Sequence, residues 1–274
     1  MLFEQAFMAL PEFLTGLPYK DYRFEGTLLT AFSMAVLQEL NGRNINNPIS
    51  ALRSEVGYEV DPTKRADLHV DLSTLNVFTP ELAAYDFYPD NWLEAKFMRL
   101  NDSGRPTVDS LKSTLLLLKD LLRLTLLPPE HALPSSHAGR YLLHAYQGLP
   151  KRHIAKKRNS QGGVQGFTRT WAQSIRTGGR QELTSFRLDR EVAQFDQLIG
   201  PSFRGMLLDI KVTTFLHEPR STGSDVYWCY LTRIDDFGIE WNGRRVDRKA
   251  GMLTEGALGQ LEELASSAAA DLAS

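Results

Sequence analysis

Cysteine is nearly absent from this chain of 274 residues, which contains only Cys229. A single thiol excludes an intramolecular disulfide, and it disfavours a cysteine-based zinc site because such sites usually need at least two thiolates. Both exclusions fit a reducing compartment, so we expect a cytoplasmic protein. Cys229 itself lies inside an aromatic stretch and is interpreted as a buried, inert thiol.

Long hydrophobic runs are also lacking. The most leucine-rich stretch, Leu111 to Leu127, is interrupted by the charged residues Lys112, Lys119, Asp120 and Arg123. A membrane span needs about 20 mostly apolar residues, so this stretch is predicted to be a buried helix, and no membrane partner is expected. No basic segment precedes an apolar run at the start of the chain, so a signal peptide is not expected either.

Several familiar active-site signatures are missing. The sequence contains no Gly-x-Ser-x-Gly nucleophile elbow, no Walker loop, no dinucleotide-binding glycine fingerprint and no His-x-x-x-His pair. Their absence argues against the hydrolases, nucleotide-binding enzymes and histidine-based zinc centres that carry them. Each of the six histidines is therefore interpreted as a structural residue.

A strong net charge is lacking as well, since the formal net charge is −2. The distribution is uneven, however, because the segment from Lys151 to Arg190 holds ten Lys and Arg but only two acids, a local excess of +8. Such a segment can neutralise phosphates and read base edges, which predicts nucleic-acid binding. A solvated flexible loop remains the alternative. The residues assigned to binding are Lys151, Arg152, Lys156, Lys157, Arg158, Gln165, Arg169, Arg176 and Arg180.

Hydrophobic periodicity predicts an α/β protein with one domain spanning residues 1–274. The expected order is a helix, three strands, a long helix and a fourth strand, at residues 21–40, 55–60, 65–72, 92–100, 108–126 and 139–147. Thr107 is the expected cap of the long helix, which can act as a crossover between two parallel strands. The remaining parts are a basic, loop-rich segment at 148–200, strands at 202–215 and 225–234, and a C-terminal helix at 253–272.

The strand at residues 92–100 carries Glu94 and Lys96, which share one face because strand side chains alternate. A carboxylate can bind Mg²⁺, and a lysine can orient the attacking water or offset charge on a phosphate. By itself Glu-x-Lys also fits an exposed, salt-bridged strand face. A similar pair, Asp209 and Lys211, precedes another strand, so we interpret it as a paired structural strand or part of a binding surface.

The preceding strand supplies two further carboxylates, Asp67 and Asp71, on one face. Pairing of the two strands would bring one of them close to Glu94, and Asp67 is favoured because it lies inside the alternating run. Asp71 stays open as the alternative, although its position suits the end of a strand. Asp90 lies four residues before Glu94, about 13 Å away at strand rise, so Pro89-Asp90 is interpreted as a turn.

This order of elements, with Asp67 on one strand and Glu94 and Lys96 on the next, resembles the core of the PD-(D/E)XK nucleases, the restriction-endonuclease-like superfamily. The resemblance covers residues 21–147 and implies an αβββαβ core whose mixed central sheet is flanked by helices. It also implies one or two Mg²⁺ ions held by Asp67 and Glu94, with Lys96 completing the motif. Many members add a glutamate on the first helix, which Glu25 fits; a Glu25 turned out to solvent is the alternative. The chain departs from the family pattern in the long gap before Glu94 and in having no proline before Asp67.

Together, the Glu94 strand and the basic segment predict a Mg²⁺-dependent endonuclease that hydrolyses DNA, with a type II restriction enzyme as one form. The assigned catalytic residues are Glu25, Asp67, Glu94 and Lys96. A two-fold homodimer would match a palindromic site. Two alternatives stay open. One is a nucleic-acid-binding protein on the same fold that does not cleave, and the other is a protein-interaction module with a basic loop.

Overall fold

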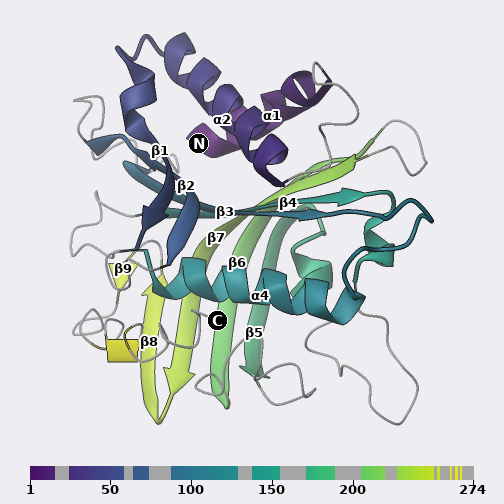
Figure 1. The fold of residues 1–274 in the computed structure, drawn as a ribbon. Helices are drawn as coiled ribbons and strands as arrows, with labels where there is room; N and C mark the ends of the chain where they lie inside the picture. The colour runs from purple at the N-terminus through teal and green to yellow at the C-terminus, as the bar shows by residue number, and fades with distance from the viewer. Residues whose placement is uncertain are drawn as a thin grey trace.

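The protein is a mixed α/β structure in which helices lie on both sides of a twisted sheet (Figure 1). The computed structural model describes residues 1–15, 25–58, 64–73, 88–128, 138–154, 171–188, 205–219, 227–249 and 252–253, and positions 260, 263, 264 and 266. Within these ranges, no helix is both long enough and apolar enough to cross a membrane.

The first half of the chain follows the predicted order of helix, three strands, helix and strand. The elements are α1 (Leu2–Thr15), α2 (Glu25–Gly42), the 3-10 helix η2 (Pro48–Ala51), β1 (Leu52–Gly57), β2 (Arg65–Asp71), β3 (Asp90–Met98), α4 (Ser110–Leu126) and β4 (Ala138–Gln147). Strand β2 is antiparallel to β1 and β3, whereas β3 and β4 are parallel. The long helix α4 is therefore the predicted crossover, because parallel strands need such a connection.

The second half of the chain extends the same sheet with antiparallel strands. These are β5 (Gly179–Leu188), β6 (Met206–His217), β7 (Tyr227–Trp241), β8 (Arg244–Lys249) and β9 (Met252–Leu253). The sheet order is β1-β2-β3-β4-β7-β6-β5, with β8 paired to β7 and β9 to β8. The first half of β7 pairs with β4 and its second half with β8, so β7 joins the two parts of the sheet. The two strands predicted after residue 200 are present as β6 and β7.

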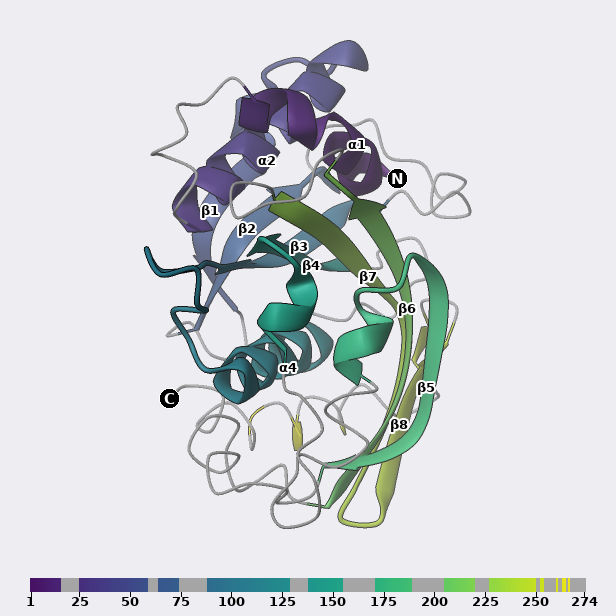
Figure 2. The same ribbon diagram turned by 90° about the vertical axis from the view of Figure 1, so that its right-hand side faces the viewer.

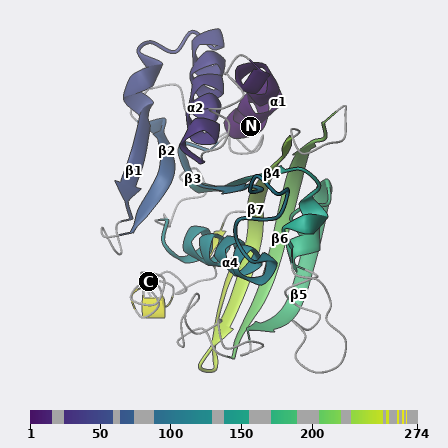
Figure 3. The same cartoon turned by 45° about the vertical axis from the view of Figure 1, so that its right-hand side comes forward.

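Two hydrophobic layers cover opposite faces of β3. Leu93 and Ala95 pack into a cluster with α1 and α2, whereas Trp92 belongs to a cluster with the leucines of α4. Figures 2 and 3 show α1 and α2 on one side of β1–β4 and α4 on the other. Because strand side chains alternate, Glu94 and Lys96 point to the same side as Trp92, toward α4.

Several elements begin at other residues than predicted, and the strand expected at 55–60 is β1, which begins three residues earlier at Leu52. Asp109, not Thr107, caps α4, because its side chain accepts a hydrogen bond from the backbone N–H of Leu111 at 2.9 Å. Aspartate and threonine both cap helices well, so the sequence does not choose between two candidates two positions apart. Asp90 likewise belongs to β3 as its first residue and not to a turn.

Two strands lie where the sequence did not predict them. β5 runs through the basic segment that was expected to be mostly loop, and it is stabilised by long-range pairing with β6, which local composition does not reveal. β8 forms a hairpin with β7 across Asn242 and Gly243, which have φ angles of 50° and 74°. Asn-Gly is a strong signal for a two-residue hairpin, so β8 could have been predicted.

The C-terminal helix begins later than expected. Leu253, the predicted start of the helix, lies in β9 instead. Helical backbone is described at positions 260, 263, 264 and 266, and the rest of the predicted helix lies outside the described residues.

Gly139 of β4 lies in a tightly packed position. A Cβ atom there would come within 2.7 Å of Asn91 Oδ1 and Tyr141 Cε2 and within 2.8 Å of Tyr88 Cδ2. We expect Gly139→Ala to lower the free energy of unfolding by about 1–3 kcal/mol, measured by urea denaturation. Gly26→Ala on α2 is the control, because its Cβ would meet nothing within 4 Å and alanine favours the helix. Equal stability of the two variants would contradict this packing.

Candidate active site

Strands β2 and β3 separate just before Glu94. Their hydrogen-bonded register ends at the pair Leu68 and Leu93. Beyond this point the backbone N–H of Ala95 donates its hydrogen bond to the side chain of Asp67, at 2.6 Å from Oδ2, and not to the backbone of β2. Asp67 therefore lies against β3 in the gap between the strands, directly beside the residues of the Glu-x-Lys pattern.

Glu25 occupies the next position along the same edge of β3. This first residue of α2 accepts a hydrogen bond from the backbone N–H of Phe97 at 3.3 Å. The same carboxylate oxygen lies 3.5 Å from Lys96 Nζ, and Asp120 Oδ2 lies 3.4 Å from Lys96 Nζ on the other side. Glu25 thus turns toward the site, as the resemblance implies, although its side chain keeps 41% of its surface exposed.

Glu94 is buried, with 2% of its surface exposed. Its Oε1 accepts a hydrogen bond from the Tyr58 hydroxyl at 2.6 Å, and the Tyr58 ring stacks on Trp92 with centroids 5.1 Å apart. Burial and the neighbouring Glu94 charge raise the pKa of Tyr58 well above its ordinary value. Tyr58 therefore remains a protonated donor that fixes the Glu94 carboxylate.

Asp120 on α4 is a member of the site that the sequence did not predict. Its side chain is only 3% exposed, and besides Lys96 it forms an ion pair with Arg123, at 3.5 Å between Oδ1 and Nη1. A clear signal existed in the sequence, since Asp120 lies between the core leucines Leu118 and Leu121. A buried carboxylate on a leucine-rich helix face needs charged partners, which points to a polar site below it.

Carboxylates outnumber cations in this group of side chains, which we call the Glu94 cluster. Its members are Glu25, Asp67, Glu94, Asp120, Lys96 and Arg123. With all six groups ionised, the cluster carries a formal excess of two negative charges, and the buried, neighbouring Lys119 reduces this excess to one while it is protonated. Burying unbalanced charge is unfavourable, so the site requires either protonation or a bound cation.

The pKa values of the carboxylates reflect this imbalance. Burial raises the pKa of Asp67 from 3.8 to about 6, although the Ala95 N–H and Lys96 act in the opposite direction. Burial, followed by the charges of Asp120 and Asp67, raises the pKa of Glu94 well above its ordinary value. Burial alone would lower the pKa of Lys96, but the surrounding carboxylates outweigh it and raise that pKa. Lys96 is therefore a permanent cation at neutral pH.

The donor set fits a hard divalent cation. Within the described part of the chain, no three His, Cys, Asp or Glu side chains already have the arrangement of a metal site. Mg²⁺, however, binds carboxylate oxygens, often uses only one or two of them and keeps several water ligands. Asp67 and Glu94 are the residues that could hold it, and its positive charge would offset the excess of negative charge in the Glu94 cluster.

The alternative aspartate, Asp71, has a local role at the end of β2. Its Oδ1 accepts a hydrogen bond from the backbone N–H of Ser73 at 2.9 Å, which closes a turn. In the strand register Asp71 lies opposite Asp90, at the start of β3. Asp67 is therefore the aspartate that lies beside Glu94.

The second acid–base pair, Asp209 and Lys211, forms cross-strand ion pairs on β6. Asp209 pairs with Arg245 of β8, and Lys211 Nζ lies 3.3 Å from Glu182 Oε1 of β5. This arrangement fits the first of the two expected alternatives, a paired structural strand: Glu182 lies on the adjacent strand β5, and Arg245 reaches Asp209 across β7 at Gly238.

The described residues of the basic segment fall into two groups. Lys151 and Arg152, in the 3-10 helix η5 (Pro150–Arg152), and Arg180, in β5, are exposed. Arg176 is half-buried, and its Nε donates to the carbonyl oxygen of Ala172 at 2.7 Å, which makes it a poorer phosphate ligand than predicted. The predicted contacts that lie outside the described residues are Lys156, Lys157, Arg158, Gln165 and Arg169.

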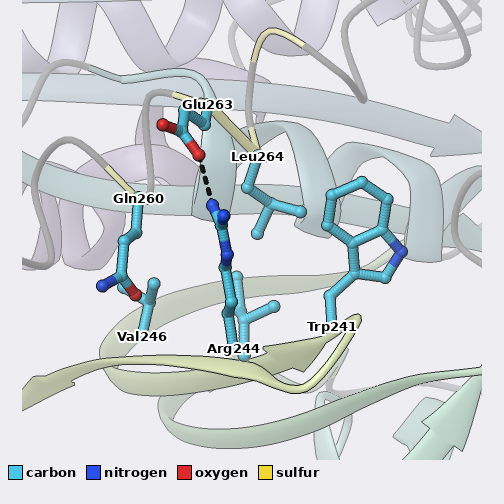
Figure 4. Close-up of a pocket in the computed structure, with 7 residues that line it drawn as sticks. Trp241, Arg244, Val246, Gln260, Glu263 and Leu264 are labelled. Carbon is cyan, nitrogen blue, oxygen red and sulfur yellow. Dashed lines mark hydrogen bonds and ion pairs between the residues drawn. The ribbon is translucent and has the colours of Figure 1, made fainter.

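A small pocket of about 80 Å³ lies elsewhere, between the β7–β8 hairpin and the C-terminal residues (Figure 4). It is lined by Ile239, Trp241, Arg244, Val246, Gln260, Glu263 and Leu264. Arg244 and Glu263 form an ion pair there, so the two charged groups of this pocket are paired with each other. No member of the Glu94 cluster lines this pocket, which therefore plays no part in the candidate active site.

No protein-family model, no curated protein and no solved structure matches this chain. The side chains of the Glu94 cluster and the charges around them are therefore the features that bear on its activity.

Proposed function

We propose that the protein is a Mg²⁺-dependent endonuclease that hydrolyses DNA, with a restriction-endonuclease-like core of the PD-(D/E)XK type. The observation that carries this proposal is the Glu94 cluster, in which carboxylates exceed cations at the point where β2 and β3 separate. The chain order α2, β1, β2, β3, α4, β4 supports the αβββαβ core. The exposed bases of η5 supply positive charge for a phosphate backbone.

Each side chain of the cluster has a distinct role in the proposed reaction. Bound Mg²⁺ would polarise the scissile phosphate and lower the pKa of a coordinated water. Asp67 and Glu94 would hold the ion, and the Tyr58 hydroxyl keeps the Glu94 carboxylate in place. Because the pKa of Lys96 is raised, Lys96 acts as a cation that offsets charge on the phosphate and not as a general base. Glu25 and Asp120 position its ammonium group from two sides.

Cleavage of plasmid and phage DNA in excess Mg²⁺ tests this function. We expect Glu94→Ala and Lys96→Ala to lower the cleavage rate by roughly a hundred-fold or more, because each removes charge from the reacting centre. EDTA should abolish cleavage in every sample. Asp209→Asn and Lys211→Met, on the second acid–base strand, are matched controls that should cleave like the wild type. Equal loss in the controls and the β3 variants would contradict the assignment to β3.

The pattern of products distinguishes forms of the nuclease. Discrete fragments would support a type II restriction enzyme, for which a two-fold homodimer would match a palindromic site. Random fragments would support an endonuclease without sequence specificity.

A second candidate is a nucleic-acid-binding protein that does not cleave. One observation favours it. Lys96 already forms ion pairs with Glu25 and Asp120, so its ammonium group is less available to a phosphate. Intact DNA with several substrates, in Mn²⁺ as well as Mg²⁺, together with salt-dependent binding, would support this candidate over the nuclease.

A further inference from the structure

Four exposed basic side chains lie on two segments at one end of the parallel pair β3 and β4. Arg99 and Arg105 belong to the loop after β3, and Lys151 and Arg152 belong to η5 after β4. Because parallel strands end at the same edge of a sheet, both segments lie at that edge (Figure 1). We call these four residues the basic edge.

Both segments of the basic edge are attached to one residue, Gln147. Its side-chain Oε1 accepts a hydrogen bond from the backbone N–H of Leu100 at 2.9 Å. Its carbonyl oxygen accepts one from His153 Nε2 at 2.8 Å. Gln147 is 7% exposed and His153 is 1% exposed, so water competes little with either contact. The two segments therefore form one structural unit.

The loop that carries the two arginines is held by its own hydrogen bonds. The backbone N–H of Asn101 donates to the Arg105 carbonyl at 2.7 Å, and that of Thr107 donates to the Arg99 carbonyl at 3.0 Å. Asn101 Oδ1 also accepts from the backbone N–H of Arg105 at 2.9 Å. The backbone under both arginines is thus fixed before any ligand binds, which lowers the entropic cost of binding.

The charges of the basic edge are not neutralised by the described residues. None of its four side chains forms an ion pair with a carboxylate in the part of the chain that the structure describes. Other exposed bases do, for example Arg244 with Glu263 and Arg245 with Asp209. Asp102 is also exposed in the loop between Arg99 and Arg105, so the surface keeps a net positive charge of three, which is complementary to a polyanion.

We propose that the basic edge binds the phosphate backbone of duplex DNA on one side of the scissile bond. This inference deepens the proposed nuclease function and rests on it. Arg99 follows Lys96 by three residues, about 10 Å at strand rise, which corresponds to the rise of roughly three base pairs along the DNA helix axis. The basic edge adds Arg99 and Arg105 to the basic segment of the sequence, which begins only at Lys151.

The salt dependence of DNA binding tests this surface without relying on cleavage. Binding of a short labelled DNA duplex is measured in EDTA over a series of NaCl concentrations. The variants are Arg99→Ala with Arg105→Ala, Lys151→Ala with Arg152→Ala, and all four together. Each pair should lower the slope of log affinity against log salt by about two, and the combination by about four. The control, Arg244→Ala with Arg245→Ala, removes two charges from β8 and should leave the slope unchanged.

Several results would overturn the proposal. An unchanged slope in the Arg99 and Arg105 variant would mean that the loop after β3 makes no phosphate contact. A fall of equal size in the β8 control would mean that only total charge matters. Tighter binding of an RNA duplex than of the DNA duplex would overturn the choice of DNA. If the slopes fall as expected but wild-type protein leaves plasmid DNA intact in Mg²⁺, the nuclease function fails while the basic edge stands.

Discussion

Asp67→Asn is expected to stabilise the metal-free protein at pH 8 while abolishing metal-dependent cleavage. The substitution removes one negative charge from a cluster that has too many, and it keeps an oxygen that can accept the hydrogen bond from the Ala95 N–H. The same substitution removes a proposed Mg²⁺ ligand. A residue that destabilises the fold but is needed for activity is typical of a functional site.

The size and pH dependence of this effect follow from the raised pKa of Asp67. Burial raises that pKa from 3.8 to about 6 in the folded protein. The folded state therefore binds this proton more tightly than the unfolded state, so Asp67 causes a loss of stability as the pH rises from about 4 to about 6. Above that window the loss is complete. A shift of about two units sets an upper bound of about 3 kcal/mol, which solvent screening reduces to about 1–2 kcal/mol.

Urea denaturation in EDTA at pH 5 and pH 8 measures this difference. The gain of Asp67→Asn over the wild type should be larger at pH 8 than at pH 5. Asp71→Asn on the same strand is the control and should show no gain, because Asp71 serves a turn with Ser73 and not the Glu94 cluster. A metal-free Asp67→Asn variant that is less stable than the wild type at pH 8 would show that the Asp67 charge is favourable, contrary to this account.

The chemistry of β3 could be predicted from the sequence because it depends on local rules. Strand alternation alone puts Glu94 and Lys96 on one face, and the structure keeps them there. Asp67 could be proposed because the order of elements suggested that its strand would pair with the Glu94 strand, and Glu25 because the resemblance implies a glutamate on the first helix. The hydrogen bonds of their carboxylates to the β3 amides could not be predicted, since they depend on where β2 stops pairing with β3.

Asp120 and Tyr58 escaped prediction for a different reason. Both residues reach the site through long-range packing. Asp120 lies on the crossover helix α4, and Tyr58 directly follows β1 in the chain. The position of Asp120 among leucines signals a polar site, but no spacing in the sequence connects either residue to Glu94. The basic edge is a similar case, because counting charges along the chain finds the cluster at Lys151 but not the arginines that the fold places beside it.

Divalent cations are expected to raise the thermal midpoint of the wild-type protein in the absence of DNA. A bound Mg²⁺ or Ca²⁺ would offset the excess negative charge of the Glu94 cluster, and the unfolded chain does not hold those carboxylates together. Ligand binding to the folded state alone stabilises it by about 2.7 kcal/mol at a concentration one hundred times the dissociation constant. The thermal midpoint is measured by circular dichroism in EDTA and then at increasing metal concentrations.

Two variants determine whether this stabilisation arises at the Glu94 cluster. Glu94→Gln keeps an acceptor for the Tyr58 hydroxyl but removes the charge, so its midpoint should no longer respond to the metal. Asp209→Asn removes a carboxylate that is already paired with Arg245, so its midpoint should rise as in the wild type. A wild-type midpoint that no divalent cation changes would mean that protonation, and not a metal, relieves the charge of the cluster. Lys96 would then lie among carboxylates without a bound metal ion. A nucleic-acid-binding protein that does not cleave would become the better account of the chain.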